Sequence, residues 1–390
     1  MKKTLSLLLV VIITIPVLCY IIVMEKNAQS VSTVNAVSEN EISNEFQSIV
    51  PKPEVSAASC VLIDAKNGDI LYGKSENKRL PMASTTKVMT AILAIEKLDL
   101  NSQVKVRFED INIEGSNIYI KTDDKLTVKD LLYGLLLESG NDCANVLAYN
   151  AAGGKEEFAK LMNQKAKELG LENTNFENPS GLDGENHYTT SKDLAKIMMY
   201  AMKNPIFREI TSCEKMTLSD GKFTKNHNKL LKMTDYCTGG KTGFTKRSGR
   251  CLVSSASRNG MEYIAVTLNA PSDWDDHIKL YEYAFSNFYP VILCSNESII
   301  ADVSGGTDVT VEIINSRDIT VRNSEVKNGC EKRIILPKFL YAPLNKGDIV
   351  GKIEFYNKEK IIDSCDLVVN KDVIKEKSSL WDKIKRGFFN

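Results

Sequence analysis

The sequence has few histidines and no regular cysteine pattern. Its three histidines, His187, His227 and His277, stand far apart and outside any H-E-x-x-H spacing, which argues against a zinc peptidase. Its nine cysteines lack C-x-x-C spacing, which argues against a zinc site or a disulfide framework. Cys237 and Cys251 flank a Lys-Thr-Gly triplet on predicted neighbouring strands, and the sequence leaves their pairing open. We expect neither a metal nor another cofactor.

The sequence also lacks a surplus of charge. It contains 50 Lys and Arg residues against 50 Asp and Glu residues, so no global basic field exists to attract nucleic acid. Hydrophobic residues make up 43% of the 390 residues, which is enough for a large core, and the length indicates two domains. We therefore expect a globular protein without a nucleic-acid partner.

The longest apolar run stands at the amino terminus. Two lysines follow Met1, and residues 5–24 are almost entirely apolar, which is typical of an export signal. A bilayer-spanning helix needs roughly 20 such residues, so residues 1–28 are predicted to be either a signal peptide or an uncut membrane anchor. Both predict an extracytoplasmic protein, secreted or attached to the outer face of the cytoplasmic membrane. Residues 29–56, rich in Ser, Asn and Glu, are predicted to be a solvated linker.

Three short motifs stand in one order along the chain. They are Ser84-Thr85-Thr86-Lys87, Ser139-Gly140-Asn141 and Lys241-Thr242-Gly243. Together they supply a nucleophile, a base, a proton relay and an anion clamp, which are the parts that acyl transfer at serine requires. The first two motifs alone are each close to noise, because S-x-x-K also occurs at Ser75, Ser212, Ser219 and Ser324, and S-x-N at Ser38, Ser75 and Ser257.

The setting of Ser84 distinguishes it from the other S-x-x-K serines. Residues 88–95, which follow Pro81, are apolar almost all round and predict a buried helix. Ser84 and Lys87 then lie one turn apart at the N-terminal end of this helix, where unpaired N–H groups favour developing negative charge. This position suits a nucleophilic serine with a lysine base.

The order of predicted elements indicates an α+β domain over residues 57–290. A hairpin of two strands begins it, residues 100–205 are mostly helical, and three strands and a helix from Asp275 to Phe288 end it. The strands are predicted at 60–63, 70–72, 241–245, 251–255 and 263–268. We expect an antiparallel sheet flanked by helices, whose first and last strands meet, with a helical lobe inserted between them.

The rest of the chain has two further parts. Residues 295–370 contain segments in which apolar and polar residues alternate, and they are predicted to form a small, separate all-β domain. Residues 373–390 place Ile374, Trp381 and Phe388 at helical spacing, with lysines largely around the other side. Such a basic amphipathic helix fits contact with a membrane surface, although a helix docked on its own domain is the alternative.

Four stretches around the motifs carry a family resemblance. They are Leu80–Lys87, Leu131–Asn141, Asn178–Leu182 and Gly239–Thr245. They resemble the serine D-alanyl-D-alanine carboxypeptidases, the low-mass penicillin-binding proteins. The resemblance covers residues 57–290 well and the C-terminal β domain more weakly. It implies a β-lactamase/transpeptidase-like catalytic fold, a peptidoglycan pentapeptide as substrate and β-lactams as inhibitors.

The chemistry of serine acylation assigns the first roles. Removal of a terminal D-Ala through an acyl-enzyme needs an attacking oxygen, which we assign to Ser84. Lys87 accepts its proton only when neutral, so the pKa of Lys87 has to fall from about 10.4 toward about 7 through burial and a second cation. Lys241 is the candidate for that cation, and for binding the substrate's terminal carboxylate with the hydroxyls of Thr242 and Thr245.

The resemblance assigns the remaining roles. Ser139 is expected to pass the proton to the departing D-Ala nitrogen, and Asn141 to hold the substrate amide and orient the lysine base. The backbone N–H groups of Ser84 and Phe244 are expected to form the oxyanion hole. Gly243 would let the substrate lie along the strand edge.

Two alternatives remain open. A class A-like β-lactamase would clear its acyl-enzyme quickly with a loop glutamate; residues 160–190 show no convincing match to that loop, although they contain Glu168, Glu172, Glu177 and Glu185. The Ser139 motif also lacks the Asp that β-lactamases usually carry at its centre. The second alternative is a catalytically inactive cell-wall-binding protein, which a penicillin would fail to label.

Overall fold

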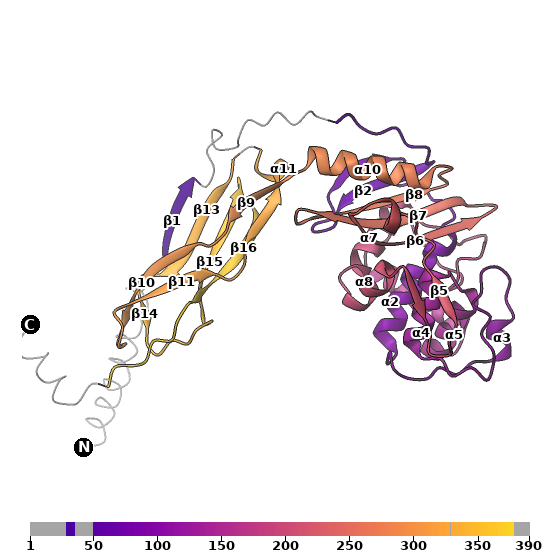
Figure 1. Ribbon diagram of the computed structural model, residues 1–390. Helices are drawn as coiled ribbons and strands as arrows, with labels where there is room; N and C mark the ends of the chain where they lie inside the picture. The colour runs from indigo at the N-terminus through magenta and orange to yellow at the C-terminus, as the bar shows by residue number, and fades with distance from the viewer. Residues whose placement is uncertain (1–28, 36–49, 328, 378–390) are drawn as a thin grey trace, which may run out of the picture. The chain divides into compact units, whose positions relative to one another are not determined.

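The computed structural model describes residues 29–35, 50–327 and 329–377. The chain divides into two compact units (Figure 1). Of the described residues, the first unit contains 50–287, and the second combines 29–35 with 288–327 and 329–377. All three motifs lie in the first unit, which therefore carries the candidate site.

An antiparallel sheet of five strands organises the first unit. Its strands are β2 (Ser59–Asp64), β3 (Ile70–Lys74), β6 (Cys237–Thr245), β7 (Gly249–Arg258) and β8 (Met261–Leu268). Their order is β3-β2-β8-β7-β6, so the first strand, β2, pairs with the last, β8, which confirms the predicted closure of the sheet. The strand that carries Lys241, β6, forms one edge and pairs only with β7 in this sheet.

Helices cover both faces of this sheet. The helix α10 (Asp273–Asn287) lies on one face and α7 (Ser191–Ala201) on the other, as Figure 1 shows. Because both faces are covered, β2, β7 and β8 are buried over nearly their whole length. The inserted lobe holds α2 (Lys87–Lys97), α3 (Phe108–Ile111), α4 (Val128–Leu137), α5 (Asn141–Ala152), α6 (Lys155–Glu168), α8 (Pro205–Ser212), α9 (Leu230–Met233) and the hairpin of β4 (Lys215–Thr217) and β5 (Phe223–Lys225).

The helix α2 lies at the centre of the lobe. Its residues Val88, Met89 and Ile92 are at most 2% exposed, which confirms the predicted buried helix. A turn of 3₁₀ helix, η1 (Ala83–Thr86), precedes it and carries Ser84. Close packing resists displacement of such a helix, so α2 holds Lys87, its first residue, in a fixed position.

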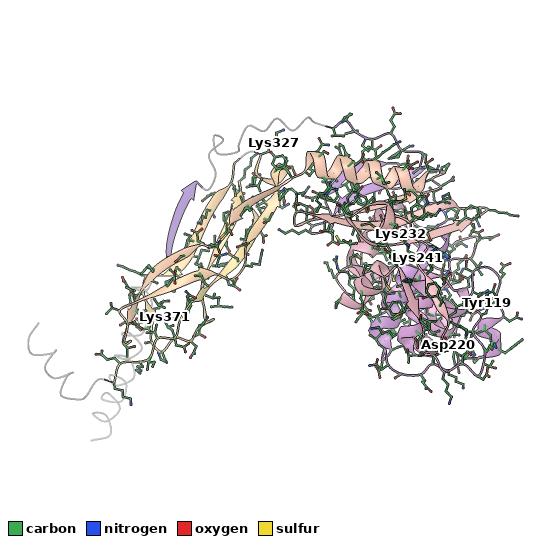
Figure 2. All side chains as sticks on the ribbon, viewed as in Figure 1. Tyr119, Asp220, Lys232, Lys241, Lys327 and Lys371 are labelled. Carbon is green, nitrogen blue, oxygen red and sulfur yellow. The ribbon has the colours of Figure 1, made fainter. Side chains whose placement is uncertain are left out.

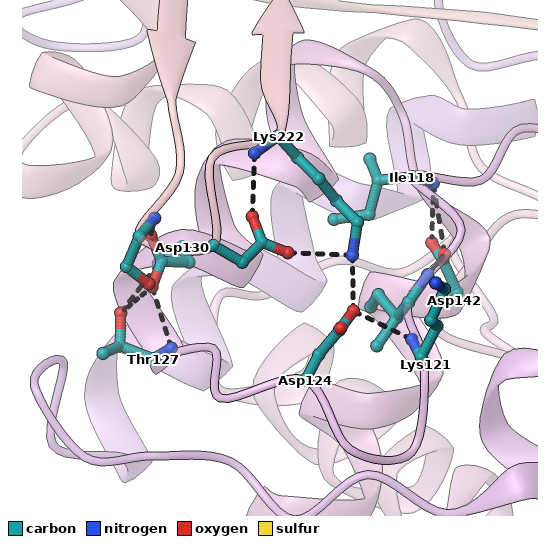
Figure 3. Close-up of polar contacts among 10 residues, drawn as sticks. Ile118, Lys121, Asp124, Thr127, Asp130, Asp142 and Lys222 are labelled. Carbon is teal, nitrogen blue, oxygen red and sulfur yellow. Dashed lines mark hydrogen bonds and ion pairs between the residues drawn. The ribbon is translucent and has the colours of Figure 1, made fainter.

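The second motif lies at the corner between α4 and α5. The predicted capping box opens α4: the Thr127 hydroxyl accepts the N–H of Asp130, and the Asp130 carboxylate accepts the N–H of Thr127 (Figure 3). In the first turn of α5, the Asp142 carboxylate accepts the N–H groups of Ile118 and Ile120, at 3.1 Å each. These bonds hold the loop before α4 against the start of α5.

The second unit contains an all-β domain with its own core. Its elements are β1 (Gln29–Asn35), β9 (Pro290–Cys294), β10 (Ser298–Ser304), β11 (Thr310–Asn315), β12 (Ile319–Arg322), α11 (Asn323–Val326), β13 (Glu331–Pro337), β14 (Leu340–Tyr341), β15 (Ile349–Asn357) and β16 (Lys360–Val369). Seven strands form one sheet in the order β1-β13-β15-β16-β11-β10-β14, and β12 pairs with β9. Ile313, Ile353 and Phe355 are fully buried in its core.

Part of the predicted linker, residues 29–35, is a strand instead. It forms β1, which runs antiparallel to β13 and places Val31 opposite Ile335. The stretch contains Val31, Thr33 and Val34, whose branched Cβ atoms favour extended backbone. The unpaired edge of β13 supplies the hydrogen bonds that a solvated linker would make with water.

The start of the predicted tail helix, residues 373–377, is extended rather than helical. Val373 is 1% exposed and exchanges both backbone hydrogen bonds with Leu344, because burial of its side chain in the domain core competes with the helix. Residues 378–390 and the predicted signal or anchor at 1–28 lie outside the described residues. No helix among the residues described is long and apolar enough to cross a membrane.

The register of β6 and β7 excludes a disulfide between Cys237 and Cys251. Cys251 lies opposite Gly243, whereas Cys237 lies opposite Ala256. A strand rises about 3.3 Å per residue, so the two cysteines are separated by roughly 20 Å along the ladder. A disulfide needs Cα atoms within about 7 Å. Both thiols are free.

Candidate active site

The three motifs converge in the first unit. Ser84 comes from η1, Ser139 from the corner between α4 and α5, and Lys241 from β6. The Nζ atom of Lys87 lies 2.9 Å from Ser84 Oγ, and the Nζ atom of Lys241 lies 3.0 Å from Ser139 Oγ. Two lysine–serine pairs therefore occupy one site, inside the unit in which Figure 2 labels Lys241.

Lys87 is fully buried and has three oxygen partners. Its Nζ atom lies 2.7 Å from Asn141 Oδ1 and 2.5 Å from the Ser180 carbonyl, in addition to Ser84 Oγ. Burial lowers the pKa of Lys87 well below its usual range, and the charge of Lys241 lowers it further. A neutral amine has two N–H groups, which can donate to Asn141 Oδ1 and to the Ser180 carbonyl. Its lone pair then faces the Ser84 hydroxyl. The geometry suits proton removal from Ser84.

Lys241 is 1% exposed and lies beside the second serine. Its Nζ atom donates to Ser139 Oγ and, at 2.9 Å, to the carbonyl of Thr242. Burial lowers the pKa of Lys241 to about 7. The two ammonium groups repel each other, which disfavours having both lysines charged at once, and the pKa of Lys87 is lowered well below its usual range.

Ser139 adopts a backbone conformation that is uncommon for a side chain with a Cβ atom. Its φ is +63°, in the left-handed region, and the next N–H, of Gly140, donates to the carbonyl of Gly134 at 3.1 Å. This corner turns the chain from α4 into α5 and directs the Ser139 hydroxyl to Lys241. Local strain of this kind persists only where the surrounding structure imposes it.

Asn141, the first residue of α5, is held at both ends of its amide. Its Oδ1 atom accepts from Lys87, and its Nδ2 atom donates to the carbonyl of Glu114 at 2.7 Å. The amide orientation follows from these two partners, because the carbonyl accepts and the NH₂ group donates. Asn141 therefore holds the Lys87 amine in place.

The edge strand β6 supplies the other predicted residues. Thr242, Gly243 and Phe244 line the cleft, whereas Thr245 does not and instead donates to Asp183 Oδ1 at 3.0 Å. A Cβ atom on Gly243 would lie 2.9 Å from the backbone nitrogen of Ser84. The close approach of η1 therefore requires glycine at this position.

The loop 178–182 belongs to the site, although its sequence assigns it no role. Its Ser180 carbonyl is one of the three oxygens around Lys87. Gly181 has φ +87°, and a Cβ atom there would lie 2.0 Å from the carbonyl oxygen of Ala83. The loop is therefore packed directly against η1, which fixes the Ser180 carbonyl relative to Ser84.

His187 connects this loop region to the start of α2. Its Nδ1 atom accepts the N–H of Glu177 at 3.0 Å, so Nε2 carries the hydrogen and donates to Thr86 Oγ1 at 2.8 Å. Burial lowers the pKa of His187 to about 4, so the ring is neutral at pH 7. His187 is a buried packing residue.

A cleft of about 340 Å³ opens above the two serines. Sequence reasoning assigned no role to six of its lining residues, because no local motif marks them: Ser116, His227, Lys229, Arg250, Asp273 and Trp274. Arg250 lies opposite Phe244 on β7, and its guanidinium donates to both carboxylate oxygens of Asp273, at 2.7 and 3.0 Å. The cleft is therefore lined by a serine pair and a fixed surface cation, and each of the two serines is hydrogen-bonded to a buried lysine.

Two family models match the chain. Residues 46–272 match D-alanyl-D-alanine carboxypeptidase, and residues 292–375 match the C-terminal domain of penicillin-binding protein 5. The chain is 32% identical over 335 residues to the D-alanyl-D-alanine carboxypeptidase DacF of Bacillus subtilis, covering 82% of this chain and 86% of DacF. It is 29% identical over 361 residues to DacC of Escherichia coli, covering 87% and 90%.

A solved structure shares the fold over most of the chain. It is penicillin-binding protein 5 from Haemophilus influenzae, with a TM-score of 0.62 and 29% identity, covering 84% of this chain and all of that one. This likeness includes the helical and β parts described above, and the family match spans the residues that bring Ser84, Ser139 and Lys241 together. The chain belongs to the D-alanyl-D-alanine carboxypeptidase family, the low-mass penicillin-binding proteins, and is a serine hydrolase that removes terminal D-Ala from peptidoglycan peptides.

Proposed function

We propose that Ser84 is the nucleophile of this carboxypeptidase and that Lys87 is its base. The observation that carries the proposal is the contact of 2.9 Å between Ser84 Oγ and a lysine whose pKa is lowered by complete burial. Lys87 takes the hydroxyl proton as Ser84 Oγ attacks the carbonyl of the penultimate D-Ala. Acidification returns a proton to Lys87 and removes this base.

The second pair acts on the leaving group. Ser139 donates a proton to the departing D-Ala nitrogen, and Lys241, at 3.0 Å, polarises the Ser139 hydroxyl. The backbone N–H groups of Ser84 and Phe244 bind the oxyanion, where loss of one donor typically costs about 3 kcal/mol. The support is the close packing of Gly243 on Ser84, which brings β6 beside the serine. Water then hydrolyses the ester.

The fate of a penicillin tests this proposal against its alternatives. We expect one penicillin to bind per chain, the added mass to map to the peptide that contains Ser84, and the adduct to persist. We expect the adduct to persist because a β-lactamase would need a loop carboxylate to activate water. In the described structure no carboxylate from residues 160–190 bonds to Ser84 or Lys87, and the loop group that reaches Lys87 is the Ser180 carbonyl. Intact-mass spectrometry over time measures it. Rapid loss of the adduct would favour a β-lactamase, and absence of any adduct an inactive wall-binding protein.

Arg250 provides a cation for the substrate's terminal carboxylate. The sequence assigns this role to Lys241, but its Nζ atom is already bonded to Ser139 and Thr242. Arg250 lines the cleft near Thr242 and is held in place by Asp273. We propose that Arg250 and the Thr242 hydroxyl bind the carboxylate together, while Lys241 supplies positive potential from below.

Replacing Arg250 with glutamine is expected to lower kcat/KM on a carboxylate-ended peptide by roughly 10- to 100-fold, because a hydrogen bond to a charged group contributes about 1.5–3 kcal/mol. The kcat/KM on an ester substrate without that carboxylate should fall only slightly. Arg250→Gln leaves Asp273 without its ion-pair partner, which can lower the fraction of enzyme that is folded. The ratio of the two rates does not depend on that fraction, so it isolates the effect on carboxylate binding. Arg247→Gln is the control, since Arg247 donates to the carbonyl of Gly184 at 2.7 Å and does not line the cleft. Equal losses on both substrates would remove Arg250 from carboxylate binding.

We also propose that the enzyme works outside the cytoplasm, next to the membrane. The apolar residues 5–24 support export, and residues 378–390 continue a basic amphipathic pattern. Ile374, just before that tail, is 69% exposed, which leaves an apolar side chain available to a membrane surface. Penicillin labelling of intact cells, followed by fractionation, is expected to recover the label with membranes.

A further inference from the structure

The hairpin of β4 and β5 is bonded to both ends of α4, the helix that leads into the corner of Ser139. At the start of the helix, the N–H and hydroxyl groups of Ser219 donate to the two oxygens of Asp130, at 3.0 and 2.6 Å. At its end, the bonds are made by the side chain of Glu138, the residue immediately before Ser139. The reaction described above gives Glu138 no part.

The carboxylate of Glu138 uses both of its oxygens. The backbone N–H of Lys225 donates to Oε1 at 2.6 Å, and Nε2 of His227 lies 3.1 Å from Oε2. The backbone N–H of His227 also donates to the carbonyl of Leu137, at 3.3 Å. These three bonds, the Glu138 clamp, join the last turn of α4 to the segment that follows β5.

This segment is itself held from the other side. Asn226 stands between the two partners of Glu138, and its Nδ2 atom donates to the carbonyls of Thr211 and Cys213, at 3.1 and 2.9 Å, where α8 ends. Its Oδ1 atom accepts the N–H of Asn228, which is 3% exposed. The clamp therefore joins α4 to a partner that is bonded to the rest of the unit.

The clamp acts next to the most unusual backbone of the site. Ser139 has a left-handed φ of +63°, which persists only where the surrounding structure imposes it. The clamp fixes the residue before this turn, and the hydroxyl after it lies 3.0 Å from Lys241 Nζ. Of the described residues that line the cleft, Ser139 is one and Glu138 is not. An effect of Glu138 on the reaction therefore passes through the residues that it holds.

We propose that Glu138 is a positioning residue for protonation of the leaving group: its carboxylate, bound to Lys225 and His227, holds the Ser139 hydroxyl where it reaches the departing nitrogen. The inference rests on the proposed role of Ser139. An amide nitrogen needs a proton to leave, so a displaced hydroxyl slows its departure. A thiolate is a good leaving group without a proton, so cleavage of a thioester does not need this hydroxyl in place.

Two substrates that differ in one atom test the inference on the full-length protein. One is a peptide that ends in D-Ala, and the other has sulfur in place of the departing nitrogen, with the same acyl group and terminal carboxylate. Glu138→Ala should lower kcat/KM on the peptide by roughly 10-fold or more, and on the thioester by no more than about 2-fold. Assays of released D-Ala and of released thiol measure the two rates.

Two further variants serve as controls. Glu138→Gln keeps a carbonyl oxygen for the N–H of Lys225 and should retain the peptide rate within about 3-fold. Glu214→Ala removes another carboxylate beside the same segment, where it pairs with Lys232 at 3.2 Å between two exposed side chains, and should leave both rates unchanged. Partial unfolding of Glu138→Ala would lower both rates by the same factor, so it does not mimic the expected result.

Ser139→Ala separates the inference from the function on which it rests. It should lower the peptide rate far more than the thioester rate, and adding Glu138→Ala to it should not change the ratio of the rates further. If Ser139→Ala behaves in this way but Glu138→Ala lowers both rates equally or neither, the inference alone is wrong. A further change of the ratio in the double variant would also overturn it. If Ser139→Ala lowers both rates equally, the proposed role of Ser139 fails, and the inference fails with it.

Discussion

D-Ala release and penicillin labelling are both expected to disappear when Ser84 is replaced by alanine, with a loss of roughly 10³-fold or more in kcat. The reason is chemical. Among the described residues, Ser84 supplies the one hydroxyl bonded to Lys87 Nζ, whereas the other two partners, Asn141 and Ser180, supply carbonyl oxygens that cannot act as a nucleophile. The fold should remain, since Lys87 keeps these two partners and the variant loses one hydrogen bond of about 1 kcal/mol. Enzyme assay, fluorescent-penicillin labelling and thermal melting measure the three quantities.

Ser116→Ala is the matched control for Ser84→Ala. Ser116 lines the same cleft, and neither lysine of the site contacts its side chain in the described structure. This control should keep both activity and label. If Ser84→Ala still released D-Ala from the pentapeptide, the assignment of the nucleophile would be wrong.

Gly181→Ala is expected to cause the second largest loss, through position and not through chemistry. A Cβ atom at Gly181 would lie 2.0 Å from the Ala83 carbonyl oxygen, so the loop or η1 has to move. The movement takes the Ser180 carbonyl away from Lys87 and disturbs the turn that carries Ser84. We expect at least a 10²-fold loss of acylation rate per folded molecule and a loss of about 3 kcal/mol in the free energy of unfolding, from left-handed strain and overpacking together.

Gly221→Ala separates the steric effect from the backbone strain. Gly221 has φ +85°, close to the +87° of Gly181, but a Cβ atom there would meet nothing within 4 Å. This control should lose only about 1–2 kcal/mol of stability and no acylation rate. Penicillin acylation kinetics and chemical denaturation of both variants provide the comparison. A Gly181→Ala variant that acylates as fast as Gly221→Ala would show that the loop does not position the lysine base.

Local sequence patterns predicted the elements that position the site. The apolar run after Pro81 is the buried helix α2, the capping box at Thr127 opens α4, and the strands around Gly68 and after Gly240 pair as a sheet with its first and last strands together. These features depend on periodicity and on hydrogen bonds between near neighbours, which are visible in any short window of sequence. The sequence therefore predicted the local element on which each of the three motifs lies.

Contacts between segments far apart in the sequence could not be predicted from local patterns. The bond from Lys87 to the Ser180 carbonyl joins residues 93 positions apart, and Arg250 faces the cleft only because β7 pairs with β6 in one particular register. The strand β1 forms because β13, about 300 residues later in the chain, offers it an edge. No spacing rule marks any of these partners, because each depends on how the elements pack.

The sequence by itself determined which groups this protein has for acyl transfer and in which local elements they stand. Only the tertiary structure decided how those groups behave. Burial lowers the pKa values of Lys87 and Lys241, and the direction of each side chain selects Ser84 for one lysine and Ser139 for the other. The physical reason is that the desolvation cost of a charged group and the hydrogen bonds available to it both depend on all the atoms around it. The chain brings those atoms together only when it folds.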